Sequence, residues 1–264
     1  MKIRVASLIL LSFTIISCTT VPITGRKQVH LLPESMMSSM SLTNYQDFLK
    51  TNPPVADNDQ NTRLVKQVGL KISAAVERYM RANNYADRVA GYNWEFNLVN
   101  SKEVNAWCMP GGKVVVYTGI LPYSKDEAGL AVVMGHEIAH AIAQHGNERM
   151  SQELAVQAVG ISIDVFMQQK PQETRDIFMS AYGVGSQLGT LAYSRSHESE
   201  ADKLGLVFMT MAGYDPARAL SFWKDMKSVG GSKPPVLLST HPSDDKRISD
   251  IQAYLPEARK YAGK

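Results

Sequence analysis

The stretch VVMGHEIAHAIAQHG, residues 132–146, places two histidines and a glutamate inside an apolar run. His136 and His140 are four residues apart, so on an α-helix their side chains lie about 40° apart on one face. Buried imidazoles on an apolar face are costly unless each of them has a partner. The His and Glu content of this chain gives a chance expectation of roughly 0.006 for HExxH. The pattern therefore predicts that both histidines bind one metal ion, with a structural histidine pair as the alternative.

Catalytic zinc usually has three protein ligands and one position open to water, so a third ligand is needed. The extended pattern HExxHxxGxxH would supply another histidine, but this chain lacks both its glycine and its third histidine. The segment SRSHESEAD, residues 194–202, is the other source. Glu198 and Asp202 share a helix face, which suits a metal ligand and an acceptor that orients a ligating histidine. Glu200 points about 200° away from Glu198, and a solvated acidic helix is the alternative for the whole segment.

The N-terminus resembles a bacterial lipoprotein signal. Residues 1–17 carry Lys2 and Arg4 and then an apolar run too short to span a membrane, and Cys18 follows. We expect cleavage before Cys18 and lipidation of its thiol, with an uncleaved signal as the alternative. Stable anchoring then needs more than one acyl chain. Thr19 is not the aspartate of an inner-membrane retention signal, so we expect a lipid anchor on the periplasmic face of the outer membrane.

Composition agrees with one globular domain. The chain has 264 residues, 44% of them hydrophobic, which is enough to bury a core. Loss of the two positive charges in residues 1–17 lowers the formal charge from +3 to +1, and a near-neutral chain gives no reason to expect a nucleic-acid partner. If Cys18 carries lipid, Cys108 has no disulfide partner. We expect Cys108 to be a packed thiol rather than a catalytic one, because no histidine lies near it in its strand-like run.

Hydrophobic periodicity divides the chain into helices and a small sheet. Residues 18–60 are predicted to be a tether with a short helix at 34–50, and residues 61–264 to be the catalytic domain. Strands are expected at 92–100 and on both sides of the Pro-Gly-Gly turn at 110–112, where the pattern predicts a β-hairpin. Helices are predicted at 61–82, 126–145, 149–169, 172–190, 195–212, 216–229 and 243–260. The predicted fold class is α+β, mostly helical, with a small antiparallel sheet and HExxH on a helix.

HExxH, then ExxAD after a Ser-Arg pair, then a late His-Pro, resembles the zinc metallopeptidases of the HtpX and BepA type. That family includes the CAAX prenyl proteases and the mitochondrial Oma peptidase. The likeness covers most of residues 60–250, and the start CTTVPITGR is similar to the lipoprotein members. The resemblance implies a zincin-like fold with one zinc ion. It implies the following residues for the site: His136, His140 and Glu198 as ligands, Glu137 as general base and Asp202 as the acceptor behind a ligand.

The resemblance also implies roles for residues outside the ligand set. Asn105 and Ala106, in the sequence NAW, correspond to the zincin edge strand, along which an extended substrate pairs its backbone. His241, in the sequence THPSDDKR, is implied to lie near the zinc. There it either stabilises the oxyanion or acts as a reversible fourth ligand; an exposed loop histidine is the alternative. Arg247, in the same sequence, is a candidate substrate contact. The absence of transmembrane helices after the signal favours a lipid-tethered peptidase over CAAX processing.

The predicted function is zinc-dependent endopeptidase action on extended polypeptides, such as unfolded or misassembled cell-envelope proteins. One alternative is a zinc-bound chaperone or assembly factor held latent by His241. The other is a structural lipoprotein with an incidental HExxH. Residues 147–192 lie between the predicted ligands and are a candidate lid. Of the remaining histidines, we expect His30 and His197 at the surface and His145 at a helix end, turned away from His140.

Overall fold

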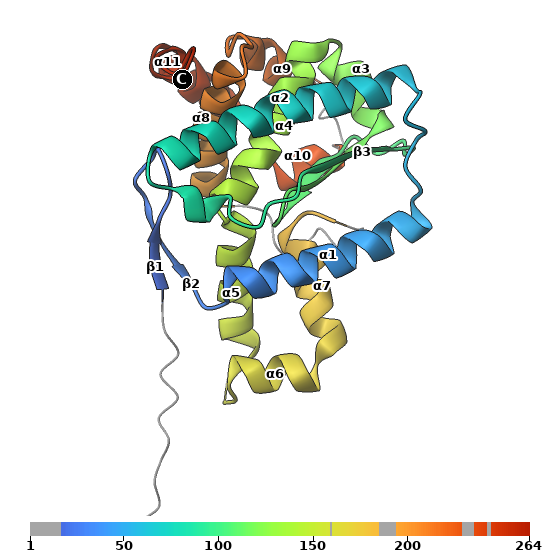
Figure 1. The fold of residues 1–264 in the computed structure, drawn as a ribbon, viewed down its shortest axis with the longest axis vertical. Helices are drawn as coiled ribbons and strands as arrows, with labels where there is room; N and C mark the ends of the chain where they lie inside the picture. The colour runs from blue at the N-terminus through green and yellow to red at the C-terminus, as the bar shows by residue number, and fades with distance from the viewer. Residues whose placement is uncertain (1–16, 159, 185–193, 229–234, 242–243) are drawn as a thin grey trace, which may run out of the picture.

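The computed structural model describes residues 17–158, 160–184, 194–228, 235–241 and 244–264. The predicted signal peptide lies outside the described residues except for Ser17. Among the described helices, none combines the length and the apolar character that a membrane span requires. The elements are mostly helical with a small sheet, which confirms the predicted α+β class (Figure 1).

The main sheet has three strands in the order β3–β5–β4. Strands β4 (Ala106–Met109) and β5 (Lys113–Tyr117) form the predicted antiparallel hairpin. Strand β3 (Glu95–Val99) pairs with β5 in parallel, so the sheet is mixed rather than antiparallel throughout. Alternation along a strand shows which face each side chain takes but not the direction of the neighbouring strand. The sequence therefore predicted the strands and the hairpin, but it did not predict the parallel pairing of β3 with β5.

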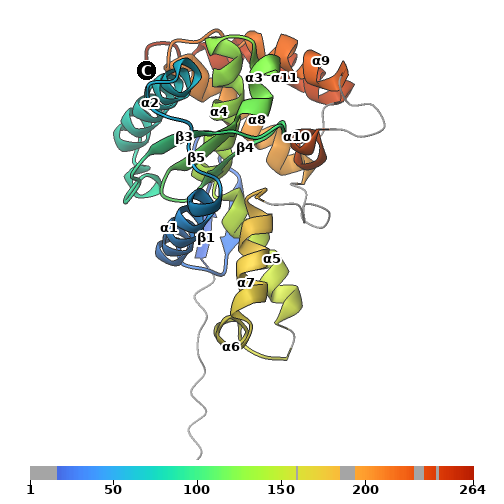
Figure 2. The same ribbon diagram turned by 90° about the vertical axis from the view of Figure 1, so that its right-hand side faces the viewer.

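Both faces of the sheet are covered, and alternate strand residues enter two different cores. Phe96, Cys108 and Val114 belong to the core shared with α2 (Gln60–Ala82) and α4 (Glu127–Ile142). Cys108 is therefore the packed thiol that we expected. Trp107 and Val115 belong to a second core. That core is shared with α1 (Glu34–Thr51), α5 (His145–Gln157) and α7 (Pro171–Ala181). Figure 2 shows α1 below the sheet and α4 above it.

Helices α4 and α8 (Arg195–Met211) cross with their backbones almost in contact, which brings the two predicted ligand segments together. The crossing lies at Gly135 and Gly205, and a Cβ atom on Gly205 would lie only 3.0 Å from the backbone nitrogen of His136. Backbone atoms inside a helix have little freedom to move aside. Glycine at these two positions is what allows so close an approach.

Gly205→Ala is expected to destabilise the protein by about 1–2 kcal/mol, because overpacking outweighs the better helix propensity of alanine. Thermal melting should fall by roughly 3–6 °C. Lys203→Ala, on the same helix, is the control, and its melting temperature should change by no more than about 1–2 °C. An unchanged or higher melting temperature for Gly205→Ala would contradict the close crossing.

The HExxH helix ends earlier than predicted. Helix α4 ends at Ile142, and α5 begins at His145. Gln144, between them, has a left-handed backbone with φ 57°. Arg88 donates from Nη1 to Oε1 of Gln144 at 2.6 Å and so holds this bend from outside the helix. Periodicity alone predicted one helix through residue 145, because nothing in it marks a left-handed glutamine.

The other predicted helices are present with shifted ends, together with short elements that periodicity missed. The predicted 149–169 helix is divided between α5 and α6, and 172–190 corresponds to α7 in its described part. The remaining elements are β1 (Ser17–Thr20), β2 (Lys27–His30), η1 (Ala86–Arg88), η2 (Thr118–Ile120), α3 (Leu121–Ser124), α6 (Ile163–Gln169), α9 (Arg218–Ser228), α10 (Val236–Thr240) and α11 (Asp245–Arg259).

Helices α5, α6 and α7 form an arm. In both views α6 lies at the end of the molecule remote from α9 and α11 (Figures 1 and 2). The described part of the candidate lid is therefore mostly an extension of the second core. Within that candidate lid, residues 159 and 185–192 lie outside the described residues.

The segment expected to be a tether is packed against the domain. Strands β1 and β2 form an antiparallel hairpin, and Val21, between them, is completely buried in the main core. Helix α1 lies where the sequence predicted a short helix and buries Met37 and Tyr45. These few apolar side chains are enough to dock a segment whose composition is otherwise polar.

Candidate metal centre

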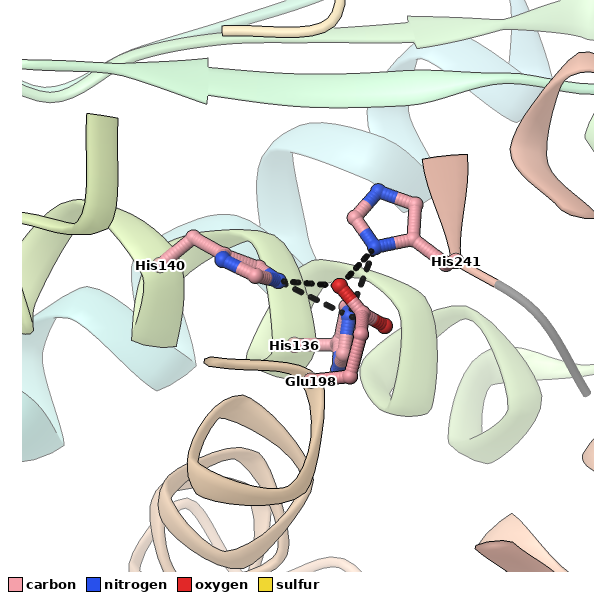
Figure 3. A group of neighbouring side chains, drawn as sticks. All are labelled: His136, His140, Glu198 and His241. Carbon is pink, nitrogen blue, oxygen red and sulfur yellow. Dashed lines mark hydrogen bonds and ion pairs between the residues drawn. The ribbon is translucent and has the colours of Figure 1, made fainter. Parts of the chain in front are cut away.

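Four side chains from three parts of the chain converge at one point (Figure 3). His136 and His140 come from α4, Glu198 from the first turns of α8, and His241 from the residue after α10. One ligand atom from each lies within 4.8 Å of the ligand atoms of the others. All four side chains are buried, none being more than 6% exposed.

The separations between these atoms suit a tetrahedral metal site. His136 Nε2 lies 3.1 Å from His140 Nε2 and 3.2 Å from His241 Nδ1. Glu198 Oε1 lies 3.3 Å from His140 Nε2 and 2.8 Å from His241 Nδ1. Zinc bonds of about 2.0–2.1 Å place tetrahedral ligand atoms roughly 3.3 Å apart. Three imidazoles and a carboxylate are also a donor set that zinc accepts, so the residues present fit this ion.

The charges of the cluster support one another. Burial by itself would raise the pKa of Glu198, but the neighbouring His241 and His136 hold it well below its usual value. Burial would lower the pKa of His136, yet its hydrogen bonds to Asp202 and Glu198 raise it to about 9. A carboxylate kept ionised in this way is ready to bind a cation.

Asp202 lies behind His136, as its spacing from Glu198 predicts. Its Oδ1 is 3.0 Å from His136 Nδ1, on the side of the ring opposite the cluster. Arg247 donates to Asp202 from Nη2 and Nε at 2.6 and 2.8 Å, and its Nη1 lies 3.2 Å from Glu198 Oε2. The guanidinium also lies over the ring of Trp223, 3.4 Å from its centroid. The structure thus turns Arg247 toward the carboxylates, and its role as a substrate contact stays a prediction. Sequence reasoning missed Trp223 altogether.

Glu137 follows the first histidine on α4 and is buried beside the cluster. Its Oε1 is 3.6 Å from His241 Nε2 and has no hydrogen-bond partner among the described residues. Burial raises the pKa of Glu137 above its usual value, although the neighbouring His241 works in the opposite direction. A buried carboxylate oxygen without a bond is placed to accept a proton from a small molecule at the centre.

His145 lies against His140, which differs from the prediction that it points away. Its Nδ1 is 2.9 Å from His140 Nδ1, and its Nε2 is 2.9 Å from Glu200 Oε2. The bend at Gln144 brings this ring back toward α4, whereas an unbroken helix would have turned it aside. Burial lowers the pKa of His145 to about 4, so the ring is neutral at neutral pH.

The prediction of surface positions for His30 and His197 is wrong, since both are buried. The ring of His197 stacks on that of His145, with centroids 4.5 Å apart, and its Nε2 lies 3.1 Å from Glu148 Oε2. His30 lies at the end of β2, which packs against α5. Neither position has a local apolar pattern that would reveal its burial, because the covering residues come from distant parts of the chain.

The salt bridge between Glu148 and Arg26 predicts a specific acid dependence of stability. Burial disfavours the charged carboxylate, but hydrogen bonds from His197 and Arg26 lower the pKa of Glu148 to about 2 from 4.5. Between these values the unfolded chain binds more protons than the folded one, so folded stability falls as pH decreases from about 4.5 to 2. With allowance for solvent screening, we expect this group to contribute about 1–2 kcal/mol at neutral pH.

In urea unfolding of the metal-free protein, Glu148→Gln should therefore be less stable than wild type at pH 7, and the gap should shrink as pH is lowered to 3. Metal-free protein is used so that zinc release does not contribute. A gap that stays constant with pH would show that the carboxylate charge is not responsible.

The start of strand β4 is engaged by the segment that carries His241. Strand β4 lies at an edge of the sheet, and both Asn105 and Ala106 are buried there. Leu237, in α10, donates its backbone N–H to the carbonyl of Val104 at 3.0 Å, and His241 donates its own N–H to the carbonyl of Leu237. One short segment thus covers the beginning of the edge strand and also supplies the fourth side chain of the cluster.

Comparison with known proteins gives matches over most of the chain. Residues 67–255 match the family described as Peptidase family M48. The mitochondrial metalloendopeptidase OMA1 of Schizosaccharomyces pombe is 35% identical over 192 residues, covering 72% of this chain and 54% of that protein. The human metalloendopeptidase OMA1 is 29% identical over 250 residues, covering 90% of this chain and 46% of that protein.

A bacterial relative matches as well. The beta-barrel assembly-enhancing protease of Yersinia pestis is 30% identical over 164 residues, covering 60% of this chain and 34% of that protein. The chain spans about half the length, or less, of these curated relatives. The matches confirm the resemblance that HExxH and ExxAD indicate. This chain belongs to peptidase family M48.

Proposed function

We propose that this protein is a zinc-dependent endopeptidase that cleaves extended polypeptides of the cell envelope. The observation that carries the proposal is the buried group of His136, His140, Glu198 and His241, whose ligand atoms lie within 4.8 Å of one another beside Glu137. The names of the relatives, a mitochondrial metalloendopeptidase and a beta-barrel assembly-enhancing protease, support peptidase activity and an envelope substrate.

In the proposed active state, His136, His140 and Glu198 hold one zinc ion per chain. When bound, zinc supplies a Lewis acid that polarises the scissile carbonyl and makes a nearby water more acidic. Glu137 takes the proton of the attacking water and returns it to the leaving amine. Its raised pKa makes Glu137 a stronger base than an exposed glutamate. Asp202 keeps His136 oriented through Nδ1.

The arrangement of His241 favours a latent resting state. Its Nδ1 lies 3.2 Å from His136 Nε2, so His241 could serve as a fourth ligand in place of water, and α10 is hydrogen-bonded to the start of β4. Movement of the segment 235–241 would open the fourth ligand position and the edge strand together. The substrate would then add its backbone to β4 at Asn105 and Ala106. A zinc-bound chaperone or assembly factor that never opens is the second candidate, and the same observation favours it.

For the N-terminus we propose the division into a signal peptide at 1–17, an N-terminal segment at 18–60 and the peptidase domain at 61–264. Cys18 is proposed to carry lipid and to anchor the protein on the periplasmic face of the outer membrane. In β1 it is paired in register with Val29, so the anchor would lie directly beside the folded hairpin. Incorporation of labelled palmitate that disappears in Cys18→Ser would support this anchoring.

Removal and return of zinc test the proposed activity. Purified protein should contain one zinc per chain by elemental analysis and should cleave unfolded casein. Dialysis against a chelator should abolish cleavage, and one equivalent of zinc should restore it. His136→Ala should neither retain zinc nor cleave. Metal-replete protein without stoichiometric zinc would contradict the proposal, whereas stoichiometric zinc with no cleavage in any state would favour the chaperone.

A further inference from the structure

The two ligating histidines of α4 are supported in different ways on the sides of their rings that face away from the cluster. The partner of His136 is the carboxylate of Asp202. The partner of His140 is another imidazole, His145, which in turn contacts the carboxylate of Glu200. Glu200 is two residues from Glu198 and faces the other way on α8, so one helix supplies a carboxylate to each side of the metal centre.

Proton positions along this chain of contacts follow from the chemistry of the site. His140 directs Nε2 into the cluster, so its Nδ1 carries a proton when Nε2 binds a metal. That N–H points at His145 Nδ1, which must accept it and therefore carries no proton. The proton of His145 is then on Nε2, which donates to Glu200 Oε2 at 2.9 Å. Along the row of groups from the Glu200 carboxylate through the two imidazoles to the metal, every N–H donor thus faces an acceptor.

Glu200 is itself fixed by the N-terminal hairpin. Arg26, just before β2, donates from Nε to Glu200 Oε2 at 2.7 Å, and the hydroxyl of Thr24 donates to Glu200 Oε1. Arg26 is held from its other side by Glu148, with Nη1 and Nη2 at 3.0 and 2.8 Å from the two carboxylate oxygens. The partners in each of these three pairs lie at least 122 residues apart in the chain, so only the folded hairpin assembles the group.

We infer that His145 and Glu200 are positioning residues for the zinc ligand His140, and that Thr24 and Arg26 make the N-terminal hairpin part of the metal centre. The inference rests on the proposed zinc site. It assigns a role to the segment next to Cys18 that a passive tether would not have. Displacement of the hairpin releases Glu200, loosens His145 and weakens the hold on zinc without removing any ligand.

Two matched pairs of variants test this inference. His145→Phe keeps an aromatic ring at this position but removes the nitrogen that faces His140. His197→Phe makes the same change in the ring that stacks on His145. Glu200→Gln removes the charge next to His145, and Glu127→Gln makes the same change in the first turn of α4, where Glu127 pairs with Lys71. Zinc dissociation constants are measured by competition with a chelator, and far-UV circular dichroism checks that each metal-free variant is folded.

The dissociation constant should rise 10–100-fold in His145→Phe and about 10-fold in Glu200→Gln, as for other partners of metal-bound histidines. The two controls should change it by less than about 3-fold. Arg26→Ala should raise it by an intermediate amount, because the carboxylate of Glu200 remains but is less fixed. The visible spectrum of the cobalt-substituted protein should also shift in His145→Phe and not in His197→Phe, since it reports ligand geometry directly.

Equal losses in the test variants and their controls would overturn the inference, because they would reflect stability alone. Unchanged dissociation constants in His145→Phe and Glu200→Gln would overturn it as well. Both results require a wild type that binds zinc. A wild type that binds none would instead contradict the proposed function, so the two failures are distinguishable.

Discussion

Replacing Glu137 by glutamine is expected to lower the rate of casein cleavage by roughly 10²–10⁴-fold, the contribution typical of a general base. Glutamine has the same shape but does not accept a proton from water at neutral pH. The Oε1 atom of Glu137 is buried next to the cluster, 3.6 Å from His241 Nε2, and lacks a hydrogen bond among the described residues. The effect should appear in kcat at saturating substrate, since the change removes chemistry rather than binding.

Zinc content and folding should remain unchanged in Glu137→Gln. Glu137 does not belong to the four side chains that could hold the metal, and burial already disfavours its charged form. A neutral amide of equal size should therefore be tolerated. Glu127→Gln is the matched control, because Glu127 lies in the first turn of the same helix and pairs with Lys71 near the surface. Full activity in Glu137→Gln with zinc bound would exclude it as the base.

Replacing His241 by alanine is expected to increase casein cleavage by about tenfold or more. Its Nδ1 lies 3.2 Å from His136 Nε2 and 2.8 Å from Glu198 Oε1, where a fourth ligand would compete with water. In the closed arrangement His241 occupies the fourth ligand position. If this arrangement is favoured by as little as 1.4 kcal/mol, only about a tenth of the molecules have that position open at any time. Removal of the side chain opens it in the remaining molecules. Zinc should be retained by the remaining three ligands.

The sign of this effect distinguishes the two roles considered for His241. A histidine needed to stabilise the oxyanion would give a loss of about 10²–10³-fold in kcat when removed. If His241 instead holds the peptidase latent, its removal increases the rate of cleavage. No cleavage in His241→Ala, with zinc bound and the fold intact, would favour the chaperone. Measurement of zinc content beside activity is essential, because loss of the metal would imitate loss of the oxyanion contact.

The sequence by itself determined the parts of this protein that depend on local spacing. His136 and His140 share a face because four residues make slightly more than one helical turn, and the same rule relates Glu198 to Asp202. Strand alternation and the Pro-Gly-Gly turn likewise predict the β4–β5 hairpin. Those patterns need no knowledge of distant contacts, so the helical class, the hairpin and the grouping of these side chains were predictable.

Tertiary structure decided which distant groups complete the centre. The left-handed Gln144, held by Arg88, ends the HExxH helix and turns His145 toward His140. The docked hairpin then brings Arg26 to Glu200, 174 residues away in the chain. Periodicity records the face of a helix but neither its bends nor the segments that cover it. The support of His140 was therefore invisible in the sequence, because it depends on packing between segments that are far apart along the chain.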